Sequence, residues 1–271
     1  MRFSWLWLLV GLVAVSARAE DEVLVFAAAS TTDALQALAP AFQQASGQRV
    51  RFAFGASSDL ARQVVAGAPA DAFLSADEAK LDTVDRAGFV QPGSRVDLLS
   101  NRLVVIVPLD SKRKVVGAEG LKGLKRVVLA DPAAVPAGVY AKAWLTKAGV
   151  WKDVAPSVVP TVDVRAALAA VESGRVDAGV VYATDALHSK KVRVVFTVPE
   201  ADAPRIVYPA AALTLGKSPK GGLAFVRFLQ TDAAREEFRK LGFLDVVRRE
   251  ATPDAGVPRS PPDAGRWRPS P

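Results

Sequence analysis

The feature that most limits the folds open to this chain is a regular alternation of short apolar runs with amphipathic segments. The runs VLVFAAA, VRFAFGA and DAFLSA begin at residues 23, 50 and 71, and a helix-like segment follows each of them. A repeated strand followed by a helix is typical of a mostly parallel sheet that is covered by helices. We therefore predict an α/β fold.

The first helix-like segment, DALQALAPAFQQAS, has a clear apolar face. Leu35, Leu38 and Phe42 recur at the spacing of one side of a helix, and Gly47 stands where a C-terminal cap is expected. Pro40 lies inside the same segment and removes one intrahelical hydrogen bond. We expect the helix to kink or to break early at this residue.

A second series of the same kind begins at Asn101. Its strand-like runs are RLVVIVP, RVVLADP and AGVVYA, and its helix-like segments are GVYAKAWLTKAG and RAALAAVESG. We predict a turn at PTVDV and a solvent-exposed loop at HSKKVRV, which begins with His188. These strands have their own helices, which indicates a second lobe.

The chain then returns to the first lobe. The run RIVYPAAALTL and the segment GLAFVRFLQTDAAREEFRKLGF resemble the strands and cover helices of the first series. We predict that lobe 1 comprises residues 20–100 and 208–247 and that lobe 2 comprises residues 101–207. The crossings are expected near Leu99–Asn101 and Val207–Pro209.

The N-terminus has the pattern of a secretory signal peptide. Arg2 precedes an apolar run, and Ala17 and Ala19 have the small-residue spacing of a cleavage site, so residues 1–19 are expected to be removed after Ala19. A signal anchor is the alternative, but the apolar run is shorter than the ~20 residues that span a bilayer. The chain has 0 cysteines and thus no cysteine for a lipid anchor, so a periplasmic location is predicted.

The C-terminal segment 248–271 is rich in proline and has no apolar period. Such a composition cannot bury enough apolar surface to offset the entropy of ordering, so we predict a disordered tail.

Several kinds of chemistry are disfavoured. His188 is the only histidine, so no set of direct metal-ion ligands is expected. FGASSD has Asp59 where a nucleophile elbow needs glycine, and the Gly-Lys-Ser at 216–218 lacks the first glycine of a P-loop. The net charge is +7, but Lys and Arg are scattered, so no nucleic-acid partner is predicted.

Hydroxyl and small residues gather where predicted strands meet predicted helices, in AAAST, GASSD, VPAGVY, VDVRA and VVYATD. Helix starts carry unpaired N–H groups and the positive end of the helix dipole, so each junction is a possible anion contact. The alternative is that Ser30, Ser58, Asp163 and Thr184 are ordinary N-caps of their own helices.

The strings VFAAASTTDALQ, FGASSDLARQVVAGAPADAFLSAD, DPAAVPAGVYAKAWL, VDVRAALAAVESGRVDAGVVYATDA and VYPAAAL resemble the molybdate-binding proteins of periplasmic ABC importers, the ModA family. The resemblance extends from about Val23 to Phe243. It implies the type II periplasmic binding protein fold, with two α/β lobes joined by two hinge strands and an oxyanion held between them.

Carried over residue by residue, the resemblance places the ligand contacts on one residue of each junction: Ser30, Ser57, Ala137, Val164 and Tyr182. Molybdenum would be bound by these residues as the oxyanion molybdate, with tungstate as a second ligand. The resemblance further implies a monomer that is not an enzyme, has no cofactor, and delivers its ligand to the permease and ATPase subunits of an importer. Gly55 and Ala56 depart from the serine-rich run that is common in the family.

The inferred contacts include hydrogen-bond donors and no carboxylate, which suits unprotonated dianions better than phosphate. Asp163 is nearby, but we expect it to cap its helix, and Arg62 and Arg165 are expected to be surface or ion-pair residues. Sulfate remains an alternative ligand. An enzyme on the same fold and a regulatory effector-binding domain are the alternatives from other classes.

Overall fold

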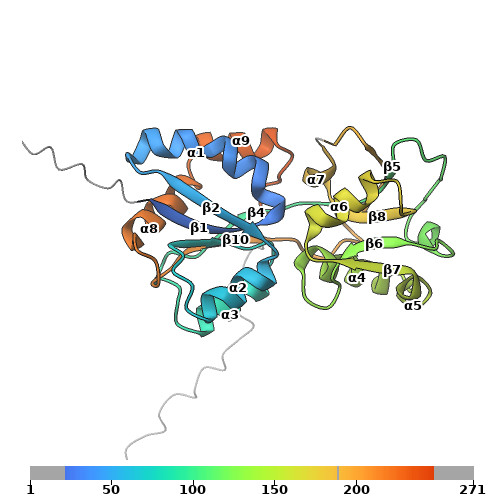
Figure 1. Cartoon of the computed structure of the whole chain (residues 1–271), viewed down its shortest axis with the longest axis horizontal. Helices are drawn as coiled ribbons and strands as arrows, with labels where there is room; N and C mark the ends of the chain where they lie inside the picture. Colours follow the sequence, from blue (N-terminus) through green and yellow to red (C-terminus); the bar gives the residue numbers. More distant parts are fainter. Residues whose placement is uncertain (1–21, 188, 247–271) are drawn as a thin grey trace, which may run out of the picture.

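The computed structural model describes residues 22–187 and 189–246, which form two five-stranded sheets side by side along the long axis, each with its own helices (Figure 1). The predicted signal peptide 1–19 with its cleavage after Ala19, His188 and the predicted tail 248–271 lie outside the described residues. Within the described part of the chain no helix is both long and apolar enough to span a bilayer.

Lobe 1 is built on the sheet β2-β1-β3-β10-β4. Its strands are β1 (Val23–Ala28), β2 (Val50–Gly55), β3 (Ala72–Leu74), β4 (Val96–Leu99) and β10 (Tyr208–Ala212). Its helices are η1 (Ala29–Thr31), α1 (Thr32–Ser46), α2 (Ser57–Val65), α3 (Glu78–Arg86), α8 (Pro219–Phe228) and α9 (Asp232–Lys240).

Lobe 2 is built on the sheet β7-β6-β8-β5-β9. Its strands are β5 (Leu103–Pro108), β6 (Val127–Ala130), β7 (Val158–Thr161), β8 (Ala178–Tyr182) and β9 (Val192–Thr197). Its helices are η2 (Glu119–Leu121), α4 (Pro136–Lys147), α5 (Trp151–Val154), η3 (Ala155–Ser157), α6 (Val164–Glu172) and α7 (Ala183–Leu187).

Both sheets are mixed, and the same rule explains both. In each sheet one strand runs against the direction of the other four, β10 in lobe 1 and β5 in lobe 2, and each is the first strand that the chain forms after it changes lobe. The other strands end at the edge that faces the opposite lobe, so the chain enters each lobe from that edge. The strand that enters a lobe must therefore run away from this edge, in the direction opposite to the other strands of its sheet.

Two predicted irregular segments contain strands. The expected turn at PTVDV overlaps the end of β7, and the expected loop at HSKKVRV is wrong from Val192 onward, where β9 begins. Both are edge strands, which have one neighbour and expose part of their surface. β7 contains Pro160, and β9 directly follows a polar run, so both segments carry the signals of turns and loops.

Of the kink or early break expected at Pro40, the early break is wrong, because α1 continues through this residue to Ser46 and ends at Gly47 with a left-handed φ of 71°. The proline deprives the carbonyl of Gln36, one turn earlier, of its intrahelical donor. Gln36 and Pro40 both lie on the exposed side of the helix, where water can replace that donor.

The core of each lobe lies between its sheet and its helices. In lobe 1 the rings of Phe42 on α1 and Phe225 on α8 meet edge to face at 5.1 Å. In lobe 2 every residue of β5 is buried, since helices and loops cover both faces of this strand. The cores hold the strand ends that form the cavity described below.

Gly138, in the first turn of α4, permits the closest approach between this helix and β6. A Cβ atom at this position would lie 2.0 Å from the carbonyl oxygen of Ala130. We predict that Gly138→Ala lowers the free energy of unfolding by about 1–3 kcal/mol, because the start of α4 must move away from the sheet. Urea denaturation monitored by circular dichroism measures the change.

Gly55→Ala is the matched control for this prediction. Gly55 also stands at a strand-to-helix junction, but its added Cβ would meet only Leu60 at 3.7 Å. This variant should unfold like the wild type within about 0.5 kcal/mol. Equal stability of both variants would contradict the packing argument.

Candidate functional site

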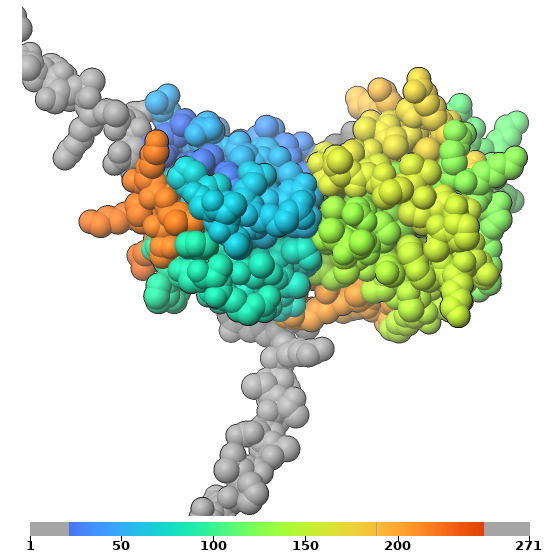
Figure 2. Space-filling view, turned by 60° about the horizontal axis from the view of Figure 1, so that its bottom comes forward, coloured from blue at the N-terminus to red at the C-terminus, as the bar shows by residue number. Residues whose placement is uncertain are grey.

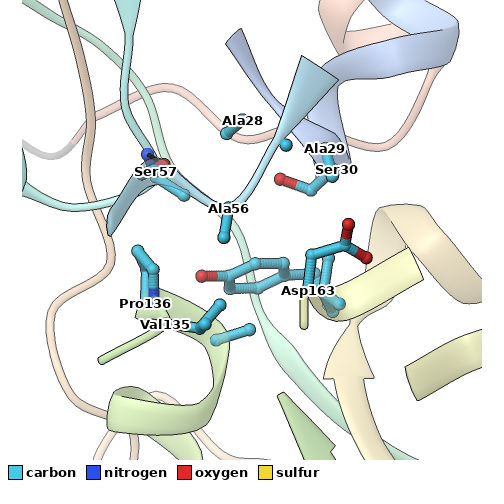
Figure 3. Close-up of a pocket in the computed structure, with 13 residues that line it drawn as sticks. Ala28, Ala29, Ser30, Ala56, Ser57, Val135, Pro136 and Asp163 are labelled. Atoms are coloured by element: carbon cyan, nitrogen blue, oxygen red, sulfur yellow. Dashed lines mark hydrogen bonds between the residues drawn. The ribbon is translucent and has the colours of Figure 1, made fainter. Parts of the chain in front are cut away.

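A small cavity lies where the two lobes meet. Its lining consists of four strand-to-helix junctions, residues 28–30 and 55–57 from lobe 1 and residues 135–137 and 163–164 from lobe 2, together with Ala76 and Tyr182. Figure 2 shows the lobes in contact along a seam, and Figure 3 shows Ser30 and Ser57 opposite Val135, Pro136 and Asp163.

The structure brings all five sequence-predicted contact residues together around this cavity: Ser30, Ser57, Ala137, Val164 and Tyr182. Each of them has a relative exposure of 4% or less. They come from five different junctions that are distant in sequence. That they bind a ligand remains a prediction, which is taken up below.

Helix starts supply backbone donors to the cavity. α2 begins at Ser57, α4 at Pro136 and α6 at Val164, and the first N–H groups of a helix have no intrahelical acceptor. Pro136 has no N–H, so Ala137 provides the first donor of α4. Three helix dipoles thus direct their positive ends at one small volume, which favours an anion.

The Ser57 hydroxyl is oriented by a neighbouring strand end. Its Oγ accepts the backbone N–H of Ala76 at 2.9 Å. An oxygen that already accepts this bond keeps its own O–H free to donate. Ser57 can therefore offer both its N–H and its O–H to the cavity.

The Ser30 hydroxyl is oriented by residues at the two crossings between the lobes. Its Oγ lies 3.1 Å from the Tyr208 hydroxyl, which in turn accepts from Asn101 Nδ2 at 3.3 Å. Because Tyr208 accepts from the amide, its own O–H is available to donate to Ser30. Ser30 then keeps its hydroxyl hydrogen for the cavity.

The Tyr182 hydroxyl is the least satisfied group of the site. Its oxygen is buried and has no hydrogen-bond partner among the described residues. Burial raises the pKa of this hydroxyl well above its usual range, so it stays protonated and can donate. An unpaired buried hydroxyl costs free energy, which a bound acceptor would recover.

Charged side chains are nearly absent from the lining. Among the described residues that line the cavity, Asp163 is the only aspartate, glutamate, lysine, arginine or histidine. Its Oδ1 accepts the backbone N–H of Ala166 at 2.8 Å. Asp163 is therefore the helix cap that the sequence predicts. The cavity offers neutral donors in place of a cationic side chain.

The alternative interpretation as N-caps is wrong for the three hydroxyl residues. Ser30 lies within η1, and its hydroxyl pairs with Tyr208. Ser58 is the second residue of α2, whose capping position is Ala56, and Thr184 lies inside α7 and accepts from Asn101 Nδ2 at 2.9 Å. These helices begin two residues earlier than the cap interpretation requires, so the hydroxyls of Ser30 and Thr184 are free for tertiary bonds.

The two arginines near the junctions do not line the cavity. Arg62 pairs with Asp59 on its own helix, as expected for an exposed ion pair. Arg165 pairs with Asp33 of lobe 1 and Asp185 of lobe 2. The sequence predicts that Arg165 forms an ion pair, but no pattern in it indicates that the partners are Asp33 and Asp185.

The supporting residues Asn101, Ala76 and Tyr208 are absent from the predicted site. Ala76 acts through its backbone, and Asn101 and Tyr208 act through Ser30 or Thr184. None of these roles leaves a local pattern in the sequence.

The cavity is very small. Its volume is about 10 Å³, roughly the room that one water molecule needs. Sites for drug-sized organic ligands measure about 300–1,000 Å³. The cavity therefore excludes organic ligands of that size, and its lining must move apart slightly to admit even a compact ion of a few atoms.

Two α/β lobes that surround a donor-lined cavity define the class of two-lobed solute-binding proteins. The family model for bacterial extracellular solute-binding proteins matches residues 23–244. Since relatives at up to 40% identity carry the name ModA, the chain belongs to the ModA family of these proteins.

Two curated relatives and one solved structure illustrate the similarity. The molybdate-binding protein ModA of Escherichia coli is 40% identical over 83% of this chain and 89% of its own length. ModA of Haemophilus influenzae is 37% identical over 87% and 95%. The periplasmic molybdate-binding protein of Azotobacter vinelandii covers 84% of this chain and 100% of its own, with a TM-score of 0.74 and 23% identity, and supports the fold.

Asp185 lies behind the cavity, three residues after Tyr182, and its carboxylate is fully buried. Burial raises the pKa of Asp185 to about 7, although the nearby Arg165 guanidinium favours the charged form. Asp33 and Asp163 add negative charge and raise this pKa further. The folded protein therefore holds this proton more tightly than the unfolded chain does.

We predict a pH-dependent stability that Asp185→Asn removes. The contribution of Asp185 is fully present below its unfolded pKa of 3.8 and is lost as the pH rises through about 7. Between pH 5 and pH 8 the wild type should lose more than about 1 kcal/mol relative to the variant. Urea denaturation at both pH values measures this, with exposed Asp110→Asn as a control that behaves like the wild type.

Proposed function

We propose that this protein captures molybdate, and also tungstate, between its two lobes and delivers it to an ABC importer. The observation that carries the proposal is the donor set of the cavity. Ser30, Ser57 and Tyr182 present hydroxyl hydrogens, and Ala137 and Val164 stand at helix starts with unpaired N–H groups. A fully ionised oxyanion accepts hydrogen bonds and donates none.

The same donor set argues against phosphate. Phosphate carries a proton near neutral pH and binds best where a carboxylate can accept it. Asp163 carries the one carboxylate among the described lining residues, and its Oδ1 is engaged as the cap of α6 by the N–H of Ala166. The geometry therefore favours dianions that are unprotonated at neutral pH.

The energetics suit a ligand that closes the lobes. Hydrogen bonds to a charged group contribute roughly 1.5–3 kcal/mol each, and two of the proposed contacts come from lobe 1 and three from lobe 2. Only the closed state offers all of them together, so the ligand shifts the population toward closure.

The relatives support molybdate as the ligand and an importer as the destination. The proteins of Escherichia coli and Haemophilus influenzae are both named molybdate-binding protein ModA. We extend this to a periplasmic monomer with its signal peptide removed after Ala19, which works without a cofactor or catalysis. The permease and ATPase subunits of the importer would recognise the closed shape.

Tyr182→Phe separates binding from stability. The variant loses one donor, so molybdate affinity should fall by roughly 1–3 kcal/mol, while the ligand-free protein should gain about 1 kcal/mol because an unpaired buried hydroxyl is removed. Calorimetric titration and urea denaturation measure the two effects. A variant that is both less stable and unchanged in affinity would contradict the assigned role of Tyr182.

Ser30→Ala and Ser57→Ala should also weaken binding by roughly 1–3 kcal/mol each. Val164→Ala is the matched control, because only the backbone N–H of this residue is proposed to contact the ligand. Its affinity should stay near that of the wild type. Unchanged calorimetric affinity in all three hydroxyl variants would overturn the site assignment.

Ligand identity is tested by thermal shift with molybdate, tungstate, sulfate and phosphate. A ligand at 100 times its Kd stabilises the folded state by about 2.7 kcal/mol. We expect molybdate and tungstate to raise the melting temperature and phosphate to have little effect. If sulfate raises the melting temperature and molybdate does not, the ligand is sulfate and the proposal of molybdate is wrong.

A further inference from the structure

One arginine connects the two lobes through a chain of ion pairs. Arg165 Nη2 lies 2.6 Å from Asp33 Oδ2, and Arg165 Nε lies 2.9 Å from Asp185 Oδ1. Asp33 is in the first turn of α1 in lobe 1, whereas Arg165 and Asp185 belong to α6 and α7 of lobe 2. The bond to Asp33 therefore crosses from one lobe to the other.

The bridge lies next to the proposed ligand contacts without entering the cavity. Arg165 follows Val164 directly, and Asp33 lies three residues after Ser30. The start of α6 packs against η1 at this place, and Figure 1 shows α6 at the side of lobe 2 that faces lobe 1. The charged groups of the bridge line a neighbouring cavity of about 420 Å³ instead.

The Asp185 carboxylate prepares the guanidinium for this bond. The Asp185 side chain is 0% exposed, and those of Arg165 and Asp33 are 29% and 43% exposed. This contact is an ion pair without a hydrogen bond, so it holds the guanidinium near α7 by charge when Asp185 is ionised. A planar guanidinium that is already placed in this way loses less freedom when it pairs with Asp33. The anchor belongs to lobe 2 alone, and the second bond forms only when the lobes are together.

We propose that Arg165 is a positioning residue that latches the lobes, so that its bond to Asp33 stabilises the closed state and slows ligand release without touching the ligand. The identity of the ligand rests on the function proposed above, and the latch itself does not. A partly exposed ion pair of this kind changes an equilibrium by about fivefold. The effect belongs to dissociation, because the pair forms after the ligand has entered.

The test uses Asp33→Asn, Arg165→Gln and the double variant, with Arg95→Gln as the matched control. Arg95 is 32% exposed and pairs with Asp82 at 2.6 Å and Asp85 at 3.5 Å, all within lobe 1. Asp33→Asn is the cleaner of the two single variants, since it leaves the pair of Arg165 with Asp185 intact.

The absence of cysteine from the chain allows dyes to be attached at two introduced cysteines, Gln43→Cys in lobe 1 and Lys152→Cys in lobe 2, both at exposed positions. Energy transfer between the dyes then reports the separation of the lobes. Stopped-flow dilution of the molybdate complex gives the rate of opening and release.

We expect Asp33→Asn and Arg165→Gln each to raise the dissociation rate about fivefold, with little change in the association rate. The double variant should be no faster than Arg165→Gln, and Arg95→Gln should match the wild type. An unchanged dissociation rate in Asp33→Asn would overturn the latch. So would a double variant whose increase in dissociation rate is the product of the two single increases, because the two residues would then act independently.

A ligand-free arm separates failure of the latch from failure of the proposed function. If the wild type binds none of the oxyanions, single-molecule energy transfer of the ligand-free proteins decides about the latch. Both single variants should then show an open-to-closed ratio about fivefold higher than that of Arg95→Gln. Equal ratios in all variants would reject the latch whatever the ligand is.

Discussion

The binding site depends on one arrangement: helix starts from both lobes direct unpaired N–H groups at a single cavity. α2 belongs to lobe 1, and α4 and α6 belong to lobe 2, so a complete donor set exists only when the lobes meet. Strand direction follows from the same arrangement. Strands end at the cavity edge, and the two strands that enter from this edge, β5 and β10, are the antiparallel ones.

The protein also sets the direction of its side-chain donors. Ser57 Oγ accepts the N–H of Ala76, and the position of Asn101 lets Tyr208 donate to Ser30. Each serine oxygen thus accepts one hydrogen bond from the protein, which leaves its hydroxyl hydrogen free to donate toward the cavity. A protonated ligand has a donor that finds no good acceptor among these groups. The neutral donors alone therefore disfavour it, without a charged side chain in the lining.

Much of this could be predicted from the sequence because it is local. The alternation of apolar runs and amphipathic segments indicated the α/β class, and the junctions contained the five predicted contact residues, each of which lines the cavity. Edge strands β7 and β9 were missed because β7 contains Pro160 and β9 directly follows a polar run. The bonds of Ser30 to Tyr208 and of Arg165 to Asp33 join residues 178 and 132 positions apart, and no local pattern records such pairs.

The most direct test of the central claim is the position of the ion itself. Crystals grown with molybdate, measured at the molybdenum absorption edge, reveal the metal by its anomalous scattering. The account predicts one strong peak between the Oγ atoms of Ser30 and Ser57, the Tyr182 hydroxyl, and the backbone nitrogens of Ala137 and Val164. A peak elsewhere in the protein, with nothing in this cavity, would contradict it.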